Sequence, residues 1–205
     1  MAESESTRWE AIVLAAGAGR RFGGRKLTAL FEGRPLIAGA LDAAFAAPAR
    51  GVILATDGDT DLVRIARDRA QALGRAADLR VVVVADAAEG MGASLRAAAQ
   101  VLPDDAAGAF VFLGDMPRIP RAVPRALASA MDGALDGSID LAAPCFEGRR
   151  GHPVLFGRVH FAALRALSGD VGAQAVLAEA GPRLALVDSP DAGVLFDVDR
   201  PEDLA

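Results

Sequence analysis

A glycine-rich, basic segment follows the first apolar run of the chain. Residues 14–26 read Leu-Ala-Ala-Gly-Ala-Gly-Arg-Arg-Phe-Gly-Gly-Arg-Lys. Small residues allow the backbone to approach a ligand closely, and successive exposed N–H groups can form a concavity that binds an anion. Arg and Lys side chains can neutralise phosphate charge. The composition predicts a polyphosphate-binding loop, with a solvated glycine turn as the alternative.

The spacing of this loop excludes two common phosphate-binding motifs. A P-loop needs Gly-Lys followed by Ser or Thr, whereas Arg25 precedes Lys26 and Leu27 follows it. A dinucleotide fingerprint places its third glycine three residues after the second, where this chain has Phe22 after Gly19. We therefore do not expect a P-loop NTPase or a dinucleotide-binding oxidoreductase.

A second motif supplies a carboxylate. Gly114-Asp115-Met116-Pro117 follows an apolar run, so we expect the Asp115 side chain at the carboxyl end of a strand, beside the glycine-rich loop. Magnesium prefers one or two carboxylates together with phosphate oxygens and water. The motif predicts a metal ligand, and the alternative is a turn-forming or helix-capping Asp115.

The elements that must position these residues follow a βαβ pattern. Apolar, β-rich runs at 10–15, 52–55, 79–84 and 109–113 alternate with helical stretches at 36–47, about 60–73 and 93–101. Further strands are expected near 141–144, 153–156 and 184–187, with a helix near 121–131. The pattern predicts an α/β fold, a three-layer Rossmann-like sandwich whose sheet is mixed and mostly parallel. Such sheets bind ligands at the carboxyl ends of their strands.

Composition narrows the functional class. A length of 205 residues favours one domain (1–205). The net charge of −5 argues against sequence-independent binding to nucleic acid. We expect no nucleic-acid partner and no membrane span, because no apolar run approaches roughly 20 residues. Cys145 is the only cysteine, which fits a cytoplasmic protein without a disulfide. The chain has one lysine, Lys26, beside 21 arginines.

The glycine-rich loop resembles the signature of the MobA-like NTP transferases, and especially their molybdenum cofactor cytidylyltransferase branch. That pattern is L-A-A-G-x-[SG]-x-R-[MF]-G-x-x-K, and residues 14–17, 19, 21–23 and 26 match it. The resemblance implies a fold of the nucleotide-diphospho-sugar transferase type and a loop that wraps a triphosphate. It assigns catalytic roles to Arg21, Lys26 and Asp115, and it assigns nucleotide binding to these three and to Leu14, Ala15, Ala16, Gly17, Ala18 and Gly19.

Two further motifs resemble nucleotide-site segments of the same family. Residues 90–95 are similar to its G-M-G-x-S-L stretch, which implies that Gly90, Met91, Gly92 and Ser94 bind the nucleotide near its base and ribose. Residues 198–204 are similar to its closing V-D-x-P-E-D-L motif, which implies Asp199 as the second metal ligand, with Asp197 as the fallback. From the residues alone, Asp199 also reads as an ordinary helix N-cap.

Two segments in the C-terminal part of the chain also resemble motifs of this family. Arg150-Gly151-His152-Pro153-Val154-Leu155-Phe156 is similar to the family's R-G-H-P-V-L-F segment, and 169–173 to its G-D-x-G-A motif. They imply a nucleotide-binding half at about 1–118 and an acceptor-binding half at about 119–205. We expect His152 to donate a hydrogen bond to the acceptor rather than to act as a base. The implied acceptor-binding residues are Arg150, His152, Pro153, Asp170 and Gly172.

The function implied by the resemblance is transfer of CMP from CTP to the terminal phosphate of molybdopterin (the molybdenum cofactor), with Mg²⁺ as cofactor and release of pyrophosphate. Guanylyltransferase members have Gly where this chain has Ala16, which favours CTP over GTP. A molybdenum hydroxylase is the expected client. The alternatives are a GTP-using guanylyltransferase, a nucleotidyltransferase for a sugar phosphate or methylerythritol phosphate, and a non-catalytic cofactor-binding partner of a molybdenum hydroxylase.

Overall fold

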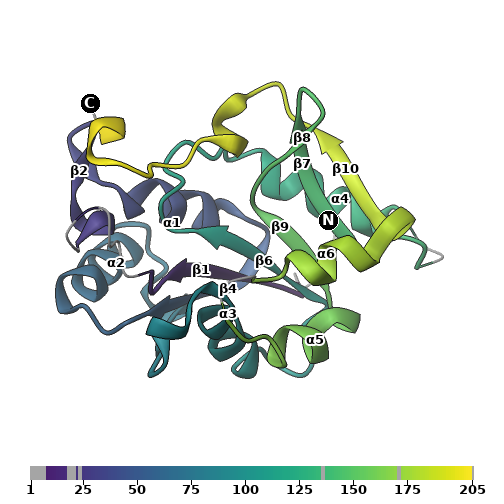
Figure 1. Ribbon diagram of the computed structural model, residues 1–205, viewed down its shortest axis with the longest axis horizontal. Coiled ribbons are helices and arrows are strands. Elements are labelled where there is room, and N and C mark those ends of the chain that lie inside the picture. The colour runs from purple at the N-terminus through teal and green to yellow at the C-terminus, as the bar shows by residue number, and fades with distance from the viewer. Residues whose placement is uncertain (1–7, 18–21, 23–24, 135–136, 170–171, 205) are drawn as a thin grey trace.

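A mixed β-sheet forms the centre of the molecule (Figure 1). The structure is a computed structural model, and it describes residues 8–17, 22, 25–134, 137–169 and 172–204. The strand order is β10-β7-β9-β6-β1-β4-β5, and the short β8 pairs with β7. The strands are β1 (Trp9–Ala15), β4 (Ala49–Thr56), β5 (Leu79–Val83), β6 (Gly108–Leu113), β7 (Leu141–Phe146), β8 (Arg149–Arg150), β9 (Val154–Gly157) and β10 (Leu184–Asp188).

Among the described residues, four of the seven strand pairs in this sheet are parallel. Strand β1 runs parallel to both β4 and β6, and β4 runs parallel to β5. Strand β9 is antiparallel to β6 and to β7, while β7 and β10 are parallel to each other. The strands of the predicted acceptor half therefore continue the sheet begun by the predicted nucleotide half. The predicted mixed, mostly parallel sheet is confirmed.

Helices cover both faces of this sheet. They are α1 (Ile37–Ala46), α2 (Thr60–Ala72), α3 (Met91–Gln100), α4 (Val123–Asp132), α5 (Phe161–Arg165) and α6 (Gln174–Ala180). Side chains along a strand alternate between the faces. In β1, Val13 packs in the core beneath α1, α2 and α4, whereas Ile12 and Leu14 pack in the core beneath α3, α5 and α6. The three-layer α/β sandwich is thus confirmed, with an apolar core on each side of the sheet.

Local sequence explains individual elements. Helix α2 begins after Asp59, whose Oδ1 accepts hydrogen bonds from the N–H groups of Asp61 (2.8 Å) and Leu62 (3.1 Å). This is the usual way in which an Asp satisfies the free amides of a first turn. Each strand and helix expected from the sequence is present, with ends that differ by up to three residues.

A third, smaller cluster joins the C-terminal segment to the region after β1. Val198 is buried with Phe31 and Leu36, and Leu27 and Phe196 pack against them. Phe31 belongs to a short hairpin of β2 (Leu30–Phe31) and β3 (Arg34–Pro35), and the yellow C-terminal segment lies beside it in Figure 1. The cluster therefore fixes residues near 198 against the part of the chain that carries Lys26. No helix in the described ranges has the length and hydropathy needed to cross a membrane.

Candidate active site

The carboxyl ends of β1 and β6 meet at one edge of the sheet. Leu14 of β1 is in register with Leu113 of β6, and the Gly114 N–H donates to the Leu14 carbonyl at 2.9 Å. Asp115 therefore lies next to the segment that follows β1, as the sequence led us to expect. Glycine is needed at 114, because a Cβ there would lie 2.8 Å from the Leu14 carbonyl oxygen.

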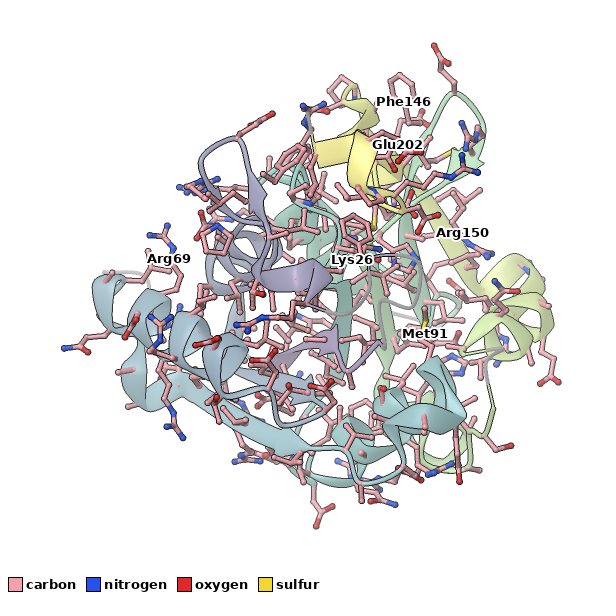
Figure 2. The ribbon with its side chains drawn as sticks, turned by 60° about the vertical axis from the view of Figure 1, so that its left-hand side comes forward. Lys26, Arg69, Met91, Phe146, Arg150 and Glu202 are labelled. Carbon is pink, nitrogen blue, oxygen red and sulfur yellow. The ribbon has the colours of Figure 1, made fainter. Side chains whose placement is uncertain are left out.

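The lysine side chain lies between two carboxylates. Lys26 Nζ is 2.8 Å from Asp115 Oδ2 and 3.6 Å from Asp199 Oδ1, and 13% of the lysine side chain is exposed. Figure 2 shows Lys26 near the middle of the face that also carries Arg150 and Met91. We call Lys26, Asp115 and Asp199 the charged corner. It joins residues from the N-terminal loop, the end of β6 and the C-terminal segment.

Backbone contacts explain why Asp199 reaches this corner. The Val198 N–H donates to the Asp115 carbonyl at 3.1 Å, and the Val198 side chain is fully buried. The Asp203 carboxylate accepts from the N–H groups of Asp199 (3.0 Å) and Arg200 (2.8 Å). Asp203 therefore caps the final turn, which leaves the Asp199 carboxylate to face Lys26. The alternative role of Asp199 as an N-cap does not match this arrangement.

Negative charge accumulates at the charged corner. Desolvation raises the pKa of the Asp197 carboxyl, the nearby carboxylates of Asp199 and Asp115 raise it further, and Lys26 opposes them. In the described part of the chain, no three His, Cys, Asp or Glu side chains form a group that could hold a metal. The carboxylates of Asp115 and Asp199, which both lie near the Lys26 ammonium, suit Mg²⁺ or Mn²⁺. Such an ion can take its remaining ligands from phosphate oxygens and water.

Helix α1 presses against the turn that carries Asp115. A Cβ placed on Gly39 would lie 2.0 Å from the Pro117 carbonyl oxygen, so only glycine allows this approach. Gly39 thus positions the 114–117 turn, a role that the sequence analysis missed. The available signal was a glycine inside an alanine-rich helix, where it costs about 1 kcal/mol relative to alanine.

The first turn of α3 contacts the predicted acceptor motif. The Gly92 N–H donates to the Gly169 carbonyl at 2.9 Å, and a Cβ on Gly92 would lie 2.5 Å from that oxygen. A Cβ on Gly172 would lie 3.3 Å from Met91 Sδ. Gly90 adopts a φ of +111°, and Ser94 is buried with its Oγ 3.5 Å from the Gly90 carbonyl oxygen. These glycines permit close packing between segments assigned to the nucleotide and to the acceptor.

A cavity of about 330 Å³ opens beside this contact. We call it the α3–α6 cavity, because it lies between α3, β6, β9 and α6. Residues from both predicted sites line it: Leu14 and Met91 from the nucleotide set, and Arg150, His152 and Gly172 from the acceptor set. Phe156 of the matched 150–156 segment and the exposed Gln174 also line it, together with Val111, which the sequence did not single out. The signal that could have found Val111, its burial next to the matched motifs, appears only in the folded chain.

Two polar residues of the cavity, Arg150 and His152, differ in exposure. Arg150 is exposed on β8, and no carboxylate among the described residues lies within 4.0 Å of its guanidinium. His152 precedes the buried Pro153 across a cis peptide bond, and its N–H donates to the Val194 carbonyl at 2.9 Å. Desolvation lowers the pKa of His152. His160, by contrast, is buried against Asp140 Oδ1 at 2.9 Å, which supports a structural role.

Comparison with known proteins identifies the family. Residues 11–184 match the family model described as the MobA-like NTP transferase domain. The chain belongs to the MobA-like NTP transferase family. As a member of this family, the protein is a nucleotidyltransferase, in agreement with the expectation from sequence. No curated protein matches the sequence.

Solved structures agree with this membership. The crystal structure of a Mycobacterium tuberculosis Rv0371c homologue from Mycobacterium sp. strain JC1 is 28% identical, with a TM-score of 0.78 over 96% of this chain and 93% of that chain. Rv0371c of M. tuberculosis H37Rv, solved as a complex with manganese, is 25% identical, with a TM-score of 0.68 over 90% and 89%. A 4-diphosphocytidyl-2C-methyl-D-erythritol synthase from Anaerococcus prevotii DSM 20548 is 14% identical, with a TM-score of 0.73 over 98% and 96%. This last likeness shows the fold alone.

The structure of this MobA-like transferase places most of the predicted site residues. Ala15 and Ala16 are buried at the end of β1, and Gly17 is exposed beyond them. Arg25, the neighbour of Lys26, forms an ion pair with Asp61. Four predicted residues lie outside the described ranges: Ala18, Gly19, Arg21 and Asp170.

Proposed function

We propose that this nucleotidyltransferase transfers CMP from CTP to the terminal phosphate of molybdopterin or the molybdenum cofactor and releases pyrophosphate. One observation carries the proposal. The charged corner and the α3–α6 cavity lie at the same end of the sheet, and Leu14 at the end of β1 is part of the cavity wall. A triphosphate held at the corner and an acceptor held in the cavity would meet at this strand edge. The halves at about 1–118 and 119–205 would supply these two sites.

The reaction requires little acid–base chemistry from the protein. An oxygen of the acceptor phosphate attacks the α-phosphorus of CTP, and the bond from this phosphorus to the bridging oxygen of pyrophosphate breaks. A phosphate monoester has a second pKa near 6, so it is largely dianionic at neutral pH and needs no general base. The protein must instead position two anions and offset their charge. Lys26 supplies positive charge at the corner, and Arg21 would supply more from the loop.

Asp115 and Asp199 would hold the divalent cation. A divalent cation held there would stabilise negative charge on the phosphates and on the leaving pyrophosphate. In the structure the Lys26 ammonium contacts both carboxylates, so their oxygens already point toward a common centre of positive charge. We propose Mg²⁺ as the resident ion, with Mn²⁺ as a substitute that can be followed by spectroscopy.

The base preference rests on Ala16. Its methyl group is buried next to the carboxyl end of β1, in the core beneath α3. We propose that this methyl narrows the base site against a purine and thereby favours CTP over GTP. An Ala16→Gly variant that gains no use of GTP would contradict this explanation.

The residues of the acceptor half support the proposal over its main alternative. A methylerythritol phosphate or a sugar phosphate offers a phosphate but no aromatic ring. The α3–α6 cavity has apolar walls at Leu14, Val111 and Phe156 and polar side chains at Arg150, His152 and Gln174, which suits a flat heterocycle with polar edges. The methylerythritol-linked synthase is similar to this chain in fold. Methylerythritol phosphate is therefore the second candidate acceptor.

The experiment is to incubate the purified protein with Mg²⁺ and molybdopterin, adding CTP or GTP separately, and to measure pyrophosphate. We expect release with CTP, little with GTP, and none without metal. Methylerythritol phosphate replaces molybdopterin in a parallel reaction. Release with methylerythritol phosphate and not with molybdopterin would transfer the assignment to that acceptor. If no acceptor gives pyrophosphate release, although the molybdopterin has been verified, the result would contradict the proposal.

The cellular setting follows from the same proposal. A cytidylated molybdenum cofactor would pass to a molybdenum hydroxylase in the cytoplasm. Association of the purified protein with such a hydroxylase, measured with and without product, tests this step.

A further inference from the structure

One arginine beside the charged corner lies over two aromatic rings. The Arg118 guanidinium carbon is 5.1 Å from the centroid of the Phe31 ring and 4.4 Å from that of the Phe196 ring. The two rings also lie against each other, with centroids 5.9 Å apart. A guanidinium within about 6 Å of a ring centroid is attracted to the negative face of the ring. We call Arg118, Phe31 and Phe196 the cation–π clamp.

The clamp joins the same three parts of the chain that form the charged corner. One clamp residue lies in the hairpin that follows Lys26, one directly follows the turn of Asp115, and one precedes Asp199 in the C-terminal segment. The corner joins these parts through charges, and the clamp joins them again through two rings and a guanidinium. Two sets of contacts among the same three segments restrain them against rotation as well as against separation.

The main chain of Arg118 also holds the C-terminal segment. A Cβ placed on Gly193 would lie 2.1 Å from the Arg118 carbonyl oxygen, so only glycine allows the two backbones to approach this closely. Further along, the Val198 N–H donates to the Asp115 carbonyl at 3.1 Å. The segment therefore meets the region of the Asp115 turn before, within and after the clamp, and it then reaches Asp199.

The ion pair of Arg118 does not account for this placement. Its Nη2 is 2.7 Å from Glu32 Oε1, but 48% of the arginine side chain and 62% of the Glu32 side chain are exposed. Such exposed pairs contribute little, because water and salt screen them. The Phe31 ring is buried, so the guanidinium lies over a surface from which water is largely excluded, where its attraction to a ring is stronger. The rings rather than the carboxylate hold the arginine.

We propose that Arg118 is a positioning residue of the charged corner, which holds Asp199 beside Asp115 by clamping the C-terminal segment against Phe31. This inference rests on the proposed function for the metal role of Asp199. Arg118 acts through Phe196 and would not contact the metal itself. With the clamp closed, the carboxylates of Asp115 and Asp199 face one centre of positive charge. An open clamp would leave Asp115 to bind the cation without its second carboxylate.

The first test follows the Val198 amide in the metal-free, full-length protein. Its exchange with deuterium reports how often the C-terminal segment opens. Arg118→Met keeps the stem of the side chain and removes the guanidinium. We expect exchange at Val198 to rise roughly 5- to 30-fold, which corresponds to the loss of one cation–π contact with each of two rings. Unchanged exchange in Arg118→Met would overturn the inference.

Two control variants separate the clamp from other effects of an arginine. Glu32→Gln removes the exposed ion pair alone, so Val198 exchange should stay within about twofold of wild type. Arg165 lies over the Phe161 ring at 5.9 Å, in a different core cluster. Arg165→Met should lower the thermal unfolding temperature and also leave Val198 exchange within about twofold. Equal acceleration in Arg118→Met and Arg165→Met would show that Arg118 merely supports the fold, and it would overturn the inference.

The second test asks whether the clamp acts on Asp199. A metal bound by both carboxylates favours the closed segment, so Mg²⁺ at about ten times its dissociation constant should slow Val198 exchange about tenfold. We expect this slowing in wild type and in Arg118→Met, and we expect it to disappear when Asp199→Ala is added to either. A merely structural role for Arg118 predicts no such dependence on metal. Slowing that persists in Asp199→Ala would overturn the inference.

The outcomes also separate this inference from the proposed function. Pyrophosphate release from CTP and molybdopterin, together with unchanged Val198 exchange in Arg118→Met, would leave the proposed function standing and refute the clamp alone. Faster exchange in Arg118→Met than in both controls, with no pyrophosphate release by wild-type protein, would support the clamp and contradict the proposed function.

Discussion

The charged corner and the α3–α6 cavity lie near each other, yet they satisfy their polar groups in opposite ways. At the corner, the Lys26 ammonium is 2.8 Å from one carboxylate and 3.6 Å from another, so its charges are paired before any ligand arrives. In the cavity, a buried nitrogen of His152 has no partner among the described residues. A ligand at the corner must therefore exchange existing contacts, whereas a ligand in the cavity meets mostly apolar side chains.

The difference has an energetic consequence. A partly buried ion pair holds its members in place but must be rearranged when a divalent cation and a triphosphate enter. We expect substitutions at the corner to act mainly on turnover and metal affinity, and substitutions in the cavity to act mainly on acceptor affinity. The following variants test the expectation for the corner.

The largest effect is expected at Asp115. Asp115→Asn keeps the size of the side chain and removes the charge that would hold the metal and face Lys26. We expect kcat for pyrophosphate release to fall on the order of 10³-fold, because metal stabilisation of phosphate charge contributes several kcal/mol. The acceptor KM should change little. Asp61→Asn, at an exposed carboxylate that pairs with Arg25, is the matched control and should stay within about twofold of wild type. A kcat within tenfold of wild type for Asp115→Asn would contradict the metal assignment.

Lys26 should give two effects of opposite sign. Lys26→Met keeps the length of the side chain and removes the ammonium, so kcat/KM for CTP should fall about 10²- to 10³-fold. Without the competing cation, Asp115 and Asp199 should bind Mn²⁺ more tightly in the absence of nucleotide, by about tenfold or ~1.4 kcal/mol.

Mn²⁺ affinity is read by titration against the protein alone, and activity by pyrophosphate release. Arg25→Met removes the adjacent cation, which pairs with Asp61 instead, and should leave Mn²⁺ affinity unchanged. Weaker Mn²⁺ binding in Lys26→Met would show that the lysine supports the metal site rather than occupying its place.

The sequence predicted the position of Asp115 well because the rule that applies is local. An apolar strand ends at Leu113, and parallel neighbours bring their carboxyl ends to the same edge of the sheet. The layers were predictable for a similar reason, since strand alternation and helical spacing report which faces are buried. These inferences need no knowledge of which distant residues finally touch.

The contacts of Asp199 and Gly39 could not be predicted in this way. Sequence reasoning treated Asp199 as a metal ligand or an N-cap, and only the folded turn shows that Asp203 performs the capping. Lys26 and Asp199 meet because Val198 is buried against distant residues of the 31–36 hairpin region. The role of Gly39 depends on how closely α1 approaches Pro117, and spacing along the chain carries no information about that approach.

Gly39 offers the smallest of the expected effects, and it tests whether the corner depends on packing behind it. In Gly39→Ala the new Cβ would lie 2.0 Å from the Pro117 carbonyl oxygen, so the 114–117 turn or α1 must move. We expect a loss of stability of about 1–3 kcal/mol from overpacking, partly offset by the better helix propensity of alanine. Displacement of Asp115 should lower kcat about tenfold, since a shift of 1 Å in a reacting group can cost up to ~10²-fold.

Ala43→Gly in the same helix separates these two effects. It removes a buried methyl group and lowers the stability of α1 by about 1 kcal/mol without pressing on the turn. Thermal unfolding should therefore detect both variants, whereas Mn²⁺ affinity and kcat should fall in Gly39→Ala alone. If both variants lose activity in proportion to their stability, then α1 merely supports the fold, and the close approach at Pro117 has no specific effect on the charged corner. If Gly39→Ala alone loses metal affinity, the packing of α1 reaches the corner through the turn and sets the position of Asp115.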